Sequence, residues 1–169
     1  QGNDAWNFRS QVMRKRSKNY KPRPIRLDTM AYVSESVTLI SSRTEFFTTL
    51  NLRQISAIGS LHLGNLTKPE ADLLIEALNV TEAYCLLGLM PEYQPEVLNA
   101  LSALNAVCVR SLAQDGKFIC QGNELDLIDE GFKVHVLQLK KSTIGLHEKA
   151  VKLVLTTLRA KRAKVIQDA

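Results

Sequence analysis

Basic side chains gather at the two ends of this chain, and they are the residues whose chemistry is most readily assigned. Residues 1–26 hold eight basic residues and one acid, residues 27–138 hold six basic residues and fourteen acids, and residues 139–169 hold eight basic residues and two acids. Guanidinium and ammonium groups donate charge-assisted hydrogen bonds to phosphate and carboxylate oxygens. We therefore expect an acidic body with two basic extremities, which suits an anionic partner or a second copy of the body.

The types and spacing of these cations favour nucleic acid. In the N-terminal segment they alternate with Tyr20, which can stack on a base, and with Asn19, which can donate to a phosphate. Near the other end, Lys149, Lys152 and Arg159 are spaced to share roughly one stripe of a helix. We predict that DNA or RNA is bound without sequence preference. The candidate binding residues are Arg14, Lys15, Arg16, Lys18, Tyr20, Lys21, Arg23, Arg26, Lys152, Arg159, Lys161, Arg162 and Lys164.

A protein partner is the alternative to nucleic acid. The same basic arm could bind an acidic host protein, as in an inhibitor or adaptor, or the acidic body of a second protomer in a homo-oligomer. The cluster of Asp126, Asp129 and Glu130 is expected to be a solvated helix face, with a dock for the basic arm as the other interpretation. The arm could also be a solubilising tail without a partner.

Enzyme chemistry has little support in the sequence. The three histidines, His62, His135 and His147, lack the spacing of metal ligands, and none of the glycine-rich phosphate loops or nucleophile turns occurs. A metal-dependent nuclease would need carboxylates that converge from different elements. We therefore expect a non-enzymatic protein with neither a cofactor nor a metal site.

The cysteine count and the apolar runs bear on the compartment. Cys85, Cys108 and Cys120 are odd in number and widely spaced, which favours free thiols in a reducing environment. No run reaches the roughly 18 consecutive apolar residues that a membrane-spanning helix needs. A soluble cytoplasmic protein without a membrane partner is the expectation.

The chain divides into three parts. Residues 1–12 begin with the Gln-Gly that a common protease site leaves, so we interpret them as the remnant of a cleaved tag, with Met13 as the native start. Residues 13–26 form a basic arm, and Pro22 and Pro24 make it extended. Residues 27–169 are expected to form a single helical domain.

Helical periodicity dominates this domain, and we predict an all-α fold, a compact bundle of five or six helices with the extended basic N-terminal arm. Thr67 and Glu70 form a capping-box pattern, with Pro69 in the first turn. The second half of that helix is apolar on almost every side and should be central to the core. The helices are predicted at 27–37, 44–63, 67–88, from Pro91 or Pro95 to 115, from Asn123 to 141, and from Ser142 or Thr143 to about 164.

The predicted core positions follow from the same period. In the helix over 44–63, Leu52 and Ile55 recur with the other apolar residues. In the last helix, we expect the apolar residues to face inward; they are Leu146, Val151, Val154, Leu155 and Leu158.

Four segments resemble a family. Lys15–Pro24, Leu27-Asp28, Ala77–Ala83 and Val134–Leu139 are similar to segments of small, basic, functionally uncharacterised proteins encoded by phages and prophages, and the similarity spans most of the chain from Met13 onward. The resemblance implies an accessory or regulatory protein of a mobile element. It assigns no functional residue.

Overall fold

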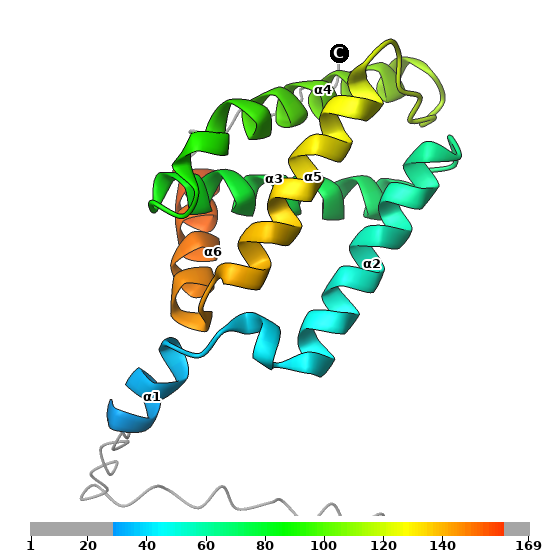
Figure 1. Cartoon of the computed structure of the whole chain (residues 1–169). Coiled ribbons are helices and arrows are strands. Elements are labelled where there is room, and N and C mark those ends of the chain that lie inside the picture. The colour runs from blue at the N-terminus through cyan, green and yellow to red at the C-terminus, as the bar shows by residue number, and fades with distance from the viewer. Residues whose placement is uncertain (1–28, 161–169) are drawn as a thin grey trace, which may run out of the picture.

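A computed structural model describes residues 29–160, and their regular elements are all helical (Figure 1). Within this range there is no strand, and one isolated β-bridge pairs Leu39 with Thr143. The all-α bundle predicted from the periodicity is confirmed, whereas the arm over 13–26 lies outside the described residues. The elements are α1 (Thr29–Ser36), η1 (Ile40–Ser42), α2 (Thr44–His62), α3 (Lys68–Leu86), η2 (Pro91–Tyr93), α4 (Gln94–Ala113), α5 (Glu124–Lys141) and α6 (Ile144–Arg159).

The helix ends follow local chemistry. At the start of α3 the backbone N–H and the hydroxyl of Thr67 donate to one oxygen of Glu70, at 2.8 and 2.7 Å, which confirms the capping box. Ser60, near the end of α2, donates to the other oxygen at 2.9 Å, so one carboxylate joins the two helices. These hydrogen bonds lower the pKa of Glu70 below its ordinary value, the bond from the Thr67 backbone most of all. Gly88 follows α3 with a φ of +89°, which only glycine adopts without strain.

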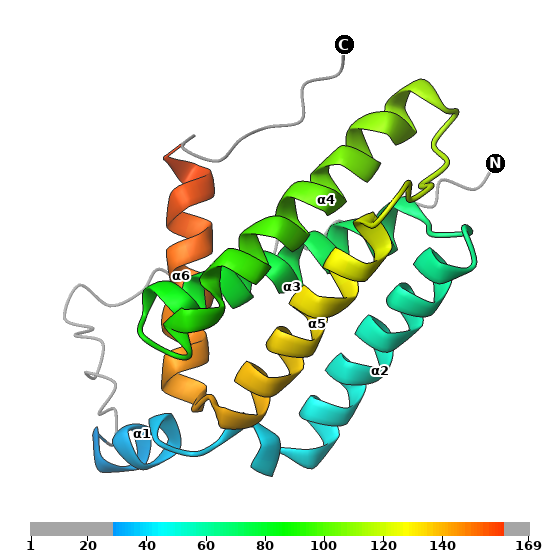
Figure 2. The same cartoon turned by 45° about the horizontal axis from the view of Figure 1, so that its top comes forward.

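Helix α3 is the centre of the fold, as its apolar second half predicts. It contacts α2, α4, α5 and α6, and Leu74, Leu78 and Tyr84 are completely buried. In Figure 2 α4, α5 and α2 run alongside one another with α3 behind them, and in both views α6 lies at one end of α3 (Figures 1 and 2). One part of the core lies among α2, α3, α4 and α5, and another joins α3 to η1 and α6.

The first helix contacts the last one at a close approach. A Cβ atom on Gly145, in the first turn of α6, would lie 2.9 Å from the Cβ of Ser36, in the last turn of α1. From this contact α6 extends away for sixteen residues, a length of about 24 Å. The start of α1 and the end of α6 therefore lie at the far ends of this helix pair (Figure 2).

Some predicted core positions are wrong. Leu155 and Leu158 of α6 are 46% and 52% exposed, because the last turns of this helix are exposed on all sides. Leu52 and Ile55 of α2 are 61% and 62% exposed, because the face of α2 packed on α3 is the one that carries Ala57 and Leu61. Helical periodicity identifies apolar residues but does not reveal which of them a neighbouring helix covers.

Two smaller findings concern α5 and membranes. Asn123 precedes α5 as predicted, but its side chain makes no capping hydrogen bond. Instead, Glu124 accepts from the backbone N–H of Gln121 at 2.7 Å and pairs with Arg110 of α4.

Within residues 29–160, none of the helices combines the length and apolarity that crossing a bilayer would require.

Candidate functional site

The described residues include two of the predicted binding residues, Lys152 and Arg159, and both lie on α6. The hydroxyl of Thr143 accepts from the backbone N–H of Leu146 at 3.3 Å, which fixes the start of this helix. The other predicted residues lie outside the described range: Arg14, Lys15, Arg16, Lys18, Tyr20, Lys21, Arg23, Arg26, Lys161, Arg162 and Lys164.

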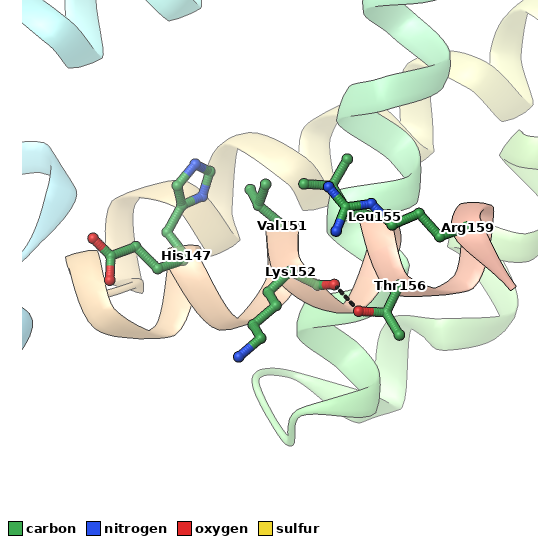
Figure 3. A pocket seen from close by; sticks show the side chains of 7 residues that line it. His147, Val151, Lys152, Leu155, Thr156 and Arg159 are labelled. Carbon is green, nitrogen blue, oxygen red and sulfur yellow. Dashed lines mark hydrogen bonds between the residues drawn. The ribbon is translucent and has the colours of Figure 1, made fainter.

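Lys152 and Arg159 border the same hollow on the surface of α6, which has a volume of about 460 Å³ (Figure 3). The two cations nevertheless point in different directions: the Lys152 ammonium extends to one side of the helix, and the Arg159 guanidinium lies on the opposite side near Leu155 (Figure 3). They are not placed to hold one phosphate between them. Lys149 is exposed but does not line the hollow. The lining residues are His147, Glu148, Val151, Lys152, Leu155, Thr156 and Arg159.

His147 connects this hollow to the core, a role that its position on a helix face did not predict. Its Nδ1 lies 2.6 Å from the hydroxyl of Tyr84, which in turn donates to Ser142 at 3.2 Å. Ser142 donates its own proton to the carbonyl of Leu139 at 3.1 Å. Each hydroxyl has one proton, so the chain of bonds requires Nδ1 of His147 to carry a proton and donate to Tyr84. The signal in the sequence is Tyr84 itself, because a buried tyrosine hydroxyl needs a partner.

The protonation states in this chain follow from burial. Burial lowers the pKa of His147, with Glu148 and Glu76 opposing the shift, so this imidazole is neutral at physiological pH. Burial also raises the pKa of Tyr84 to about 12, which keeps its hydroxyl protonated. His147 thus adds no positive charge to the hollow, and the chain of hydrogen bonds anchors α6 to α3 and α5.

A second histidine, His135, is fully buried, whereas His147 is only partly buried. Nδ1 of His135 is 2.7 Å from the hydroxyl of Thr81, and that hydroxyl donates to the carbonyl of Ala77 at 2.8 Å. His135 is therefore the donor in its bond with Thr81. Burial, and to a smaller extent His147, lowers the pKa of His135 to about 3. Through these Nδ1 hydrogen bonds, both histidines hold helices together.

Few of the described cations are neutralised by carboxylates. The ion pairs within residues 29–160 are Arg43–Glu35, His62–Asp129 and Arg110–Glu124. None of them includes the exposed cations at the end of α5 and along α6, which are Lys140, Lys141, Lys149, Lys152 and Arg159. Lys140 and Lys141 end α5 and are not among the binding residues predicted from the sequence, although their place just before the start of α6 is visible in it.

The acidic cluster is divided by the fold. Asp129 faces α2 and lies 3.0 Å from Nε2 of His62, whereas Asp126 and Glu130 are exposed. Over residues 29–160, no three His, Cys, Asp or Glu side chains are grouped so that they could hold a metal ion. Burial raises the pKa of all three cysteine thiols, to about 11 for Cys108.

Comparison of the chain with models of known protein families, with curated proteins and with solved structures finds no match.

Proposed function

We propose that this chain is a non-enzymatic accessory protein that binds the phosphate backbone of DNA or RNA through its basic ends. The observation that carries the proposal is the absence, within residues 29–160, of any carboxylate partner for the exposed cations Lys140, Lys141, Lys149, Lys152 and Arg159. Such cations are available to neutralise phosphates and release counterions. The resemblance to phage and prophage proteins supports the context, that of a mobile element.

The spacing of these cations favours backbone contacts without base readout. Lys149 and Arg159 are ten residues apart on one helix, a separation of about 15 Å along its axis. The ammonium of Lys152 and the guanidinium of Arg159 point to different sides (Figure 3). Scattered charges of this kind contact several phosphates one by one, which gives affinity without sequence preference.

The test is a salt titration of binding to a labelled duplex DNA and a labelled single-stranded RNA, followed by fluorescence anisotropy. Neutralisation of about six phosphates predicts a log–log slope of roughly −5 on duplex DNA. The double variant Lys152→Gln with Arg159→Gln should reduce the magnitude of the slope by about 2, and deletion of residues 14–26 should reduce it further.

The matched control is Lys68→Gln with Lys117→Gln, two exposed cations that lie elsewhere on the bundle. This control should leave the slope within about half a unit of the parent value. Equal losses from both double variants, or affinity that does not respond to deletion of the arm, would show that the basic ends are not the binding surface.

A protein partner is the second candidate function, and a specific observation favours it. Leu155 and Leu158 are exposed beside Lys152 and Arg159, and apolar side chains gain nothing from phosphate. In this candidate the basic arm and α6 would bind an acidic protein. The double variant Leu155→Asn with Leu158→Asn distinguishes the two candidate functions. If the chain binds nucleic acid, the salt slope of that binding should stay unchanged. If α6 binds an acidic protein, the affinity for that protein should fall because the interface loses its apolar contact.

A further inference from the structure

A groove separate from the α6 surface lies between α2 and α5. It has a volume of about 450 Å³, and its lining is almost entirely apolar. Ile55 on the α2 wall is 62% exposed and Leu137 on the α5 wall is 43% exposed, and the buried Phe132 also lines the groove. Figure 2 shows α2 and α5 side by side at this position. Exposed apolar side chains that gather in one groove make it a candidate interaction site.

Two charges of opposite sign border this groove. Asp129 and Lys133 both line it, and they are four residues apart on α5, which places them on the same face of the helix. Asp129 contacts His62, whereas the ammonium of Lys133 has no carboxylate partner within residues 29–160. The α5 wall of the groove therefore carries one acid and one base, about one helical turn apart.

This pattern is complementary to itself. A nucleic acid or an acidic peptide over the groove would meet the Asp129 carboxylate, and a basic peptide would meet the Lys133 ammonium. A second copy that is rotated by a twofold axis near Phe132, with its α5 antiparallel to the first, places each acid against the other copy's base. The α6 surface has the opposite property, because its cations Lys149, Lys152 and Arg159 would repel a second α6.

We infer that the α2–α5 groove is the interface of a twofold-symmetric homodimer of this chain, in which Asp129 of each copy faces Lys133 of the other across the apolar residues. The interface is distinct from the basic arm and from α6, so the inference does not depend on the proposed nucleic-acid binding. In the dimer, α2 and α5 of the two copies form a four-helix contact, and the exposed Ile55 and Leu137 become covered.

Charge reversal tests this geometry more sharply than loss of an apolar contact. The dimerisation constant of the full chain is measured by sedimentation equilibrium for the parent, for Asp129→Lys, for Lys133→Asp and for the double reversal. Each single reversal places like charges across the axis and should weaken the dimer at least about tenfold. The double reversal restores opposite charges and should recover the parent constant to within about threefold.

Three further variants complete the experiment. Ile55→Lys should give a monomer, and its far-ultraviolet circular dichroism should match the parent because Ile55 is exposed. His62→Gln measures what loss of the Asp129 contact alone does, and Leu155→Gln on α6 should leave the dimer intact. If the parent chain stays monomeric at every concentration in sedimentation equilibrium, the inference is wrong and a second copy does not cover the groove. A double reversal no tighter than the single variants would overturn it as well.

Discussion

Gly131 of α5 lies so close to Ala100 of α4 that a Cβ atom on the glycine would be 2.4 Å from the Ala100 Cβ and 3.2 Å from a methyl group of Leu78. The two helices have the most extensive contact in the described fold. Both neighbours are buried and completely shielded from solvent. The contact therefore sets how closely α4 and α5 pack, and α5 in turn positions the walls of the groove.

Gly131→Ala should lower the free energy of unfolding by up to about 2 kcal/mol, because the backbones of α4 and α5 must separate at a cost of about 1–3 kcal/mol. The gain in helix propensity from glycine to alanine, about 1 kcal/mol, offsets part of this cost. The control is Gly59→Ala in α2, where a Cβ meets nothing within 4 Å. That control should stabilise the protein by about 0.5–1 kcal/mol, as measured by urea unfolding at equal protein concentrations. Equal effects of the two substitutions would contradict the close packing.

Tyr84→Phe should lower the free energy of unfolding by about 1–3 kcal/mol, because the fully buried hydroxyl of Tyr84 is lost and the Nδ1–H of His147 loses its acceptor. Amide hydrogen exchange should also become faster in α6 than in α4, because the hydroxyl of Tyr84 anchors α6. The control is Tyr93→Phe, whose half-buried hydroxyl makes no hydrogen bond within residues 29–160. It should change the stability by less than about 0.5 kcal/mol. If amide exchange in Tyr84→Phe is no faster in α6 than in α4, as is expected for Tyr93→Phe, the hydroxyl of Tyr84 does not anchor α6.

His135 should make the stability depend on pH. Its pKa falls from the ordinary value of 6.5 to about 3 on folding, so between these values the unfolded chain binds a proton that the folded chain does not. Stability should therefore decrease as pH falls through this window, by up to about 1.4 kcal/mol per pH unit from this residue. In His135→Gln this contribution is removed, and urea unfolding from about pH 7 to about pH 4 should show a shallower slope.

The control for this pH dependence is His62→Gln, which removes an exposed histidine of α2. It should retain the parent slope over the same range. A His135→Gln variant as steep as the parent would mean that His135 is protonated in the folded protein.

Much of the architecture can be predicted from local patterns. The capping box of Thr67 and Glu70 and the glycine after α3 mark helix ends through bonds between residues close in the chain. The all-α class follows from apolar residues at a helical period. The central place of α3 follows from Tyr84 and its apolar neighbours, since a helix that is apolar on every side must be buried.

The candidate surfaces are less predictable. The sequence places Leu155 in the core and does not identify Lys140 as a binding residue, yet both are exposed on the surface that we propose for binding. Neither Ile55 nor Leu137 stands out from the other apolar residues in the chain. Their exposure depends on which face of α2 and of α5 the neighbouring helices cover, which periodicity does not encode.

The sequence by itself determined the helices, the capping box of α3 and the separation of charge along the chain, because these depend on interactions within a few residues. Only the tertiary structure decided that Asp129 and Lys133 border an apolar groove, that His147 contacts Tyr84, and that α6 extends beyond its neighbours. These relationships join residues far apart in the chain, and they depend on which face of each helix the packing of the other helices leaves uncovered.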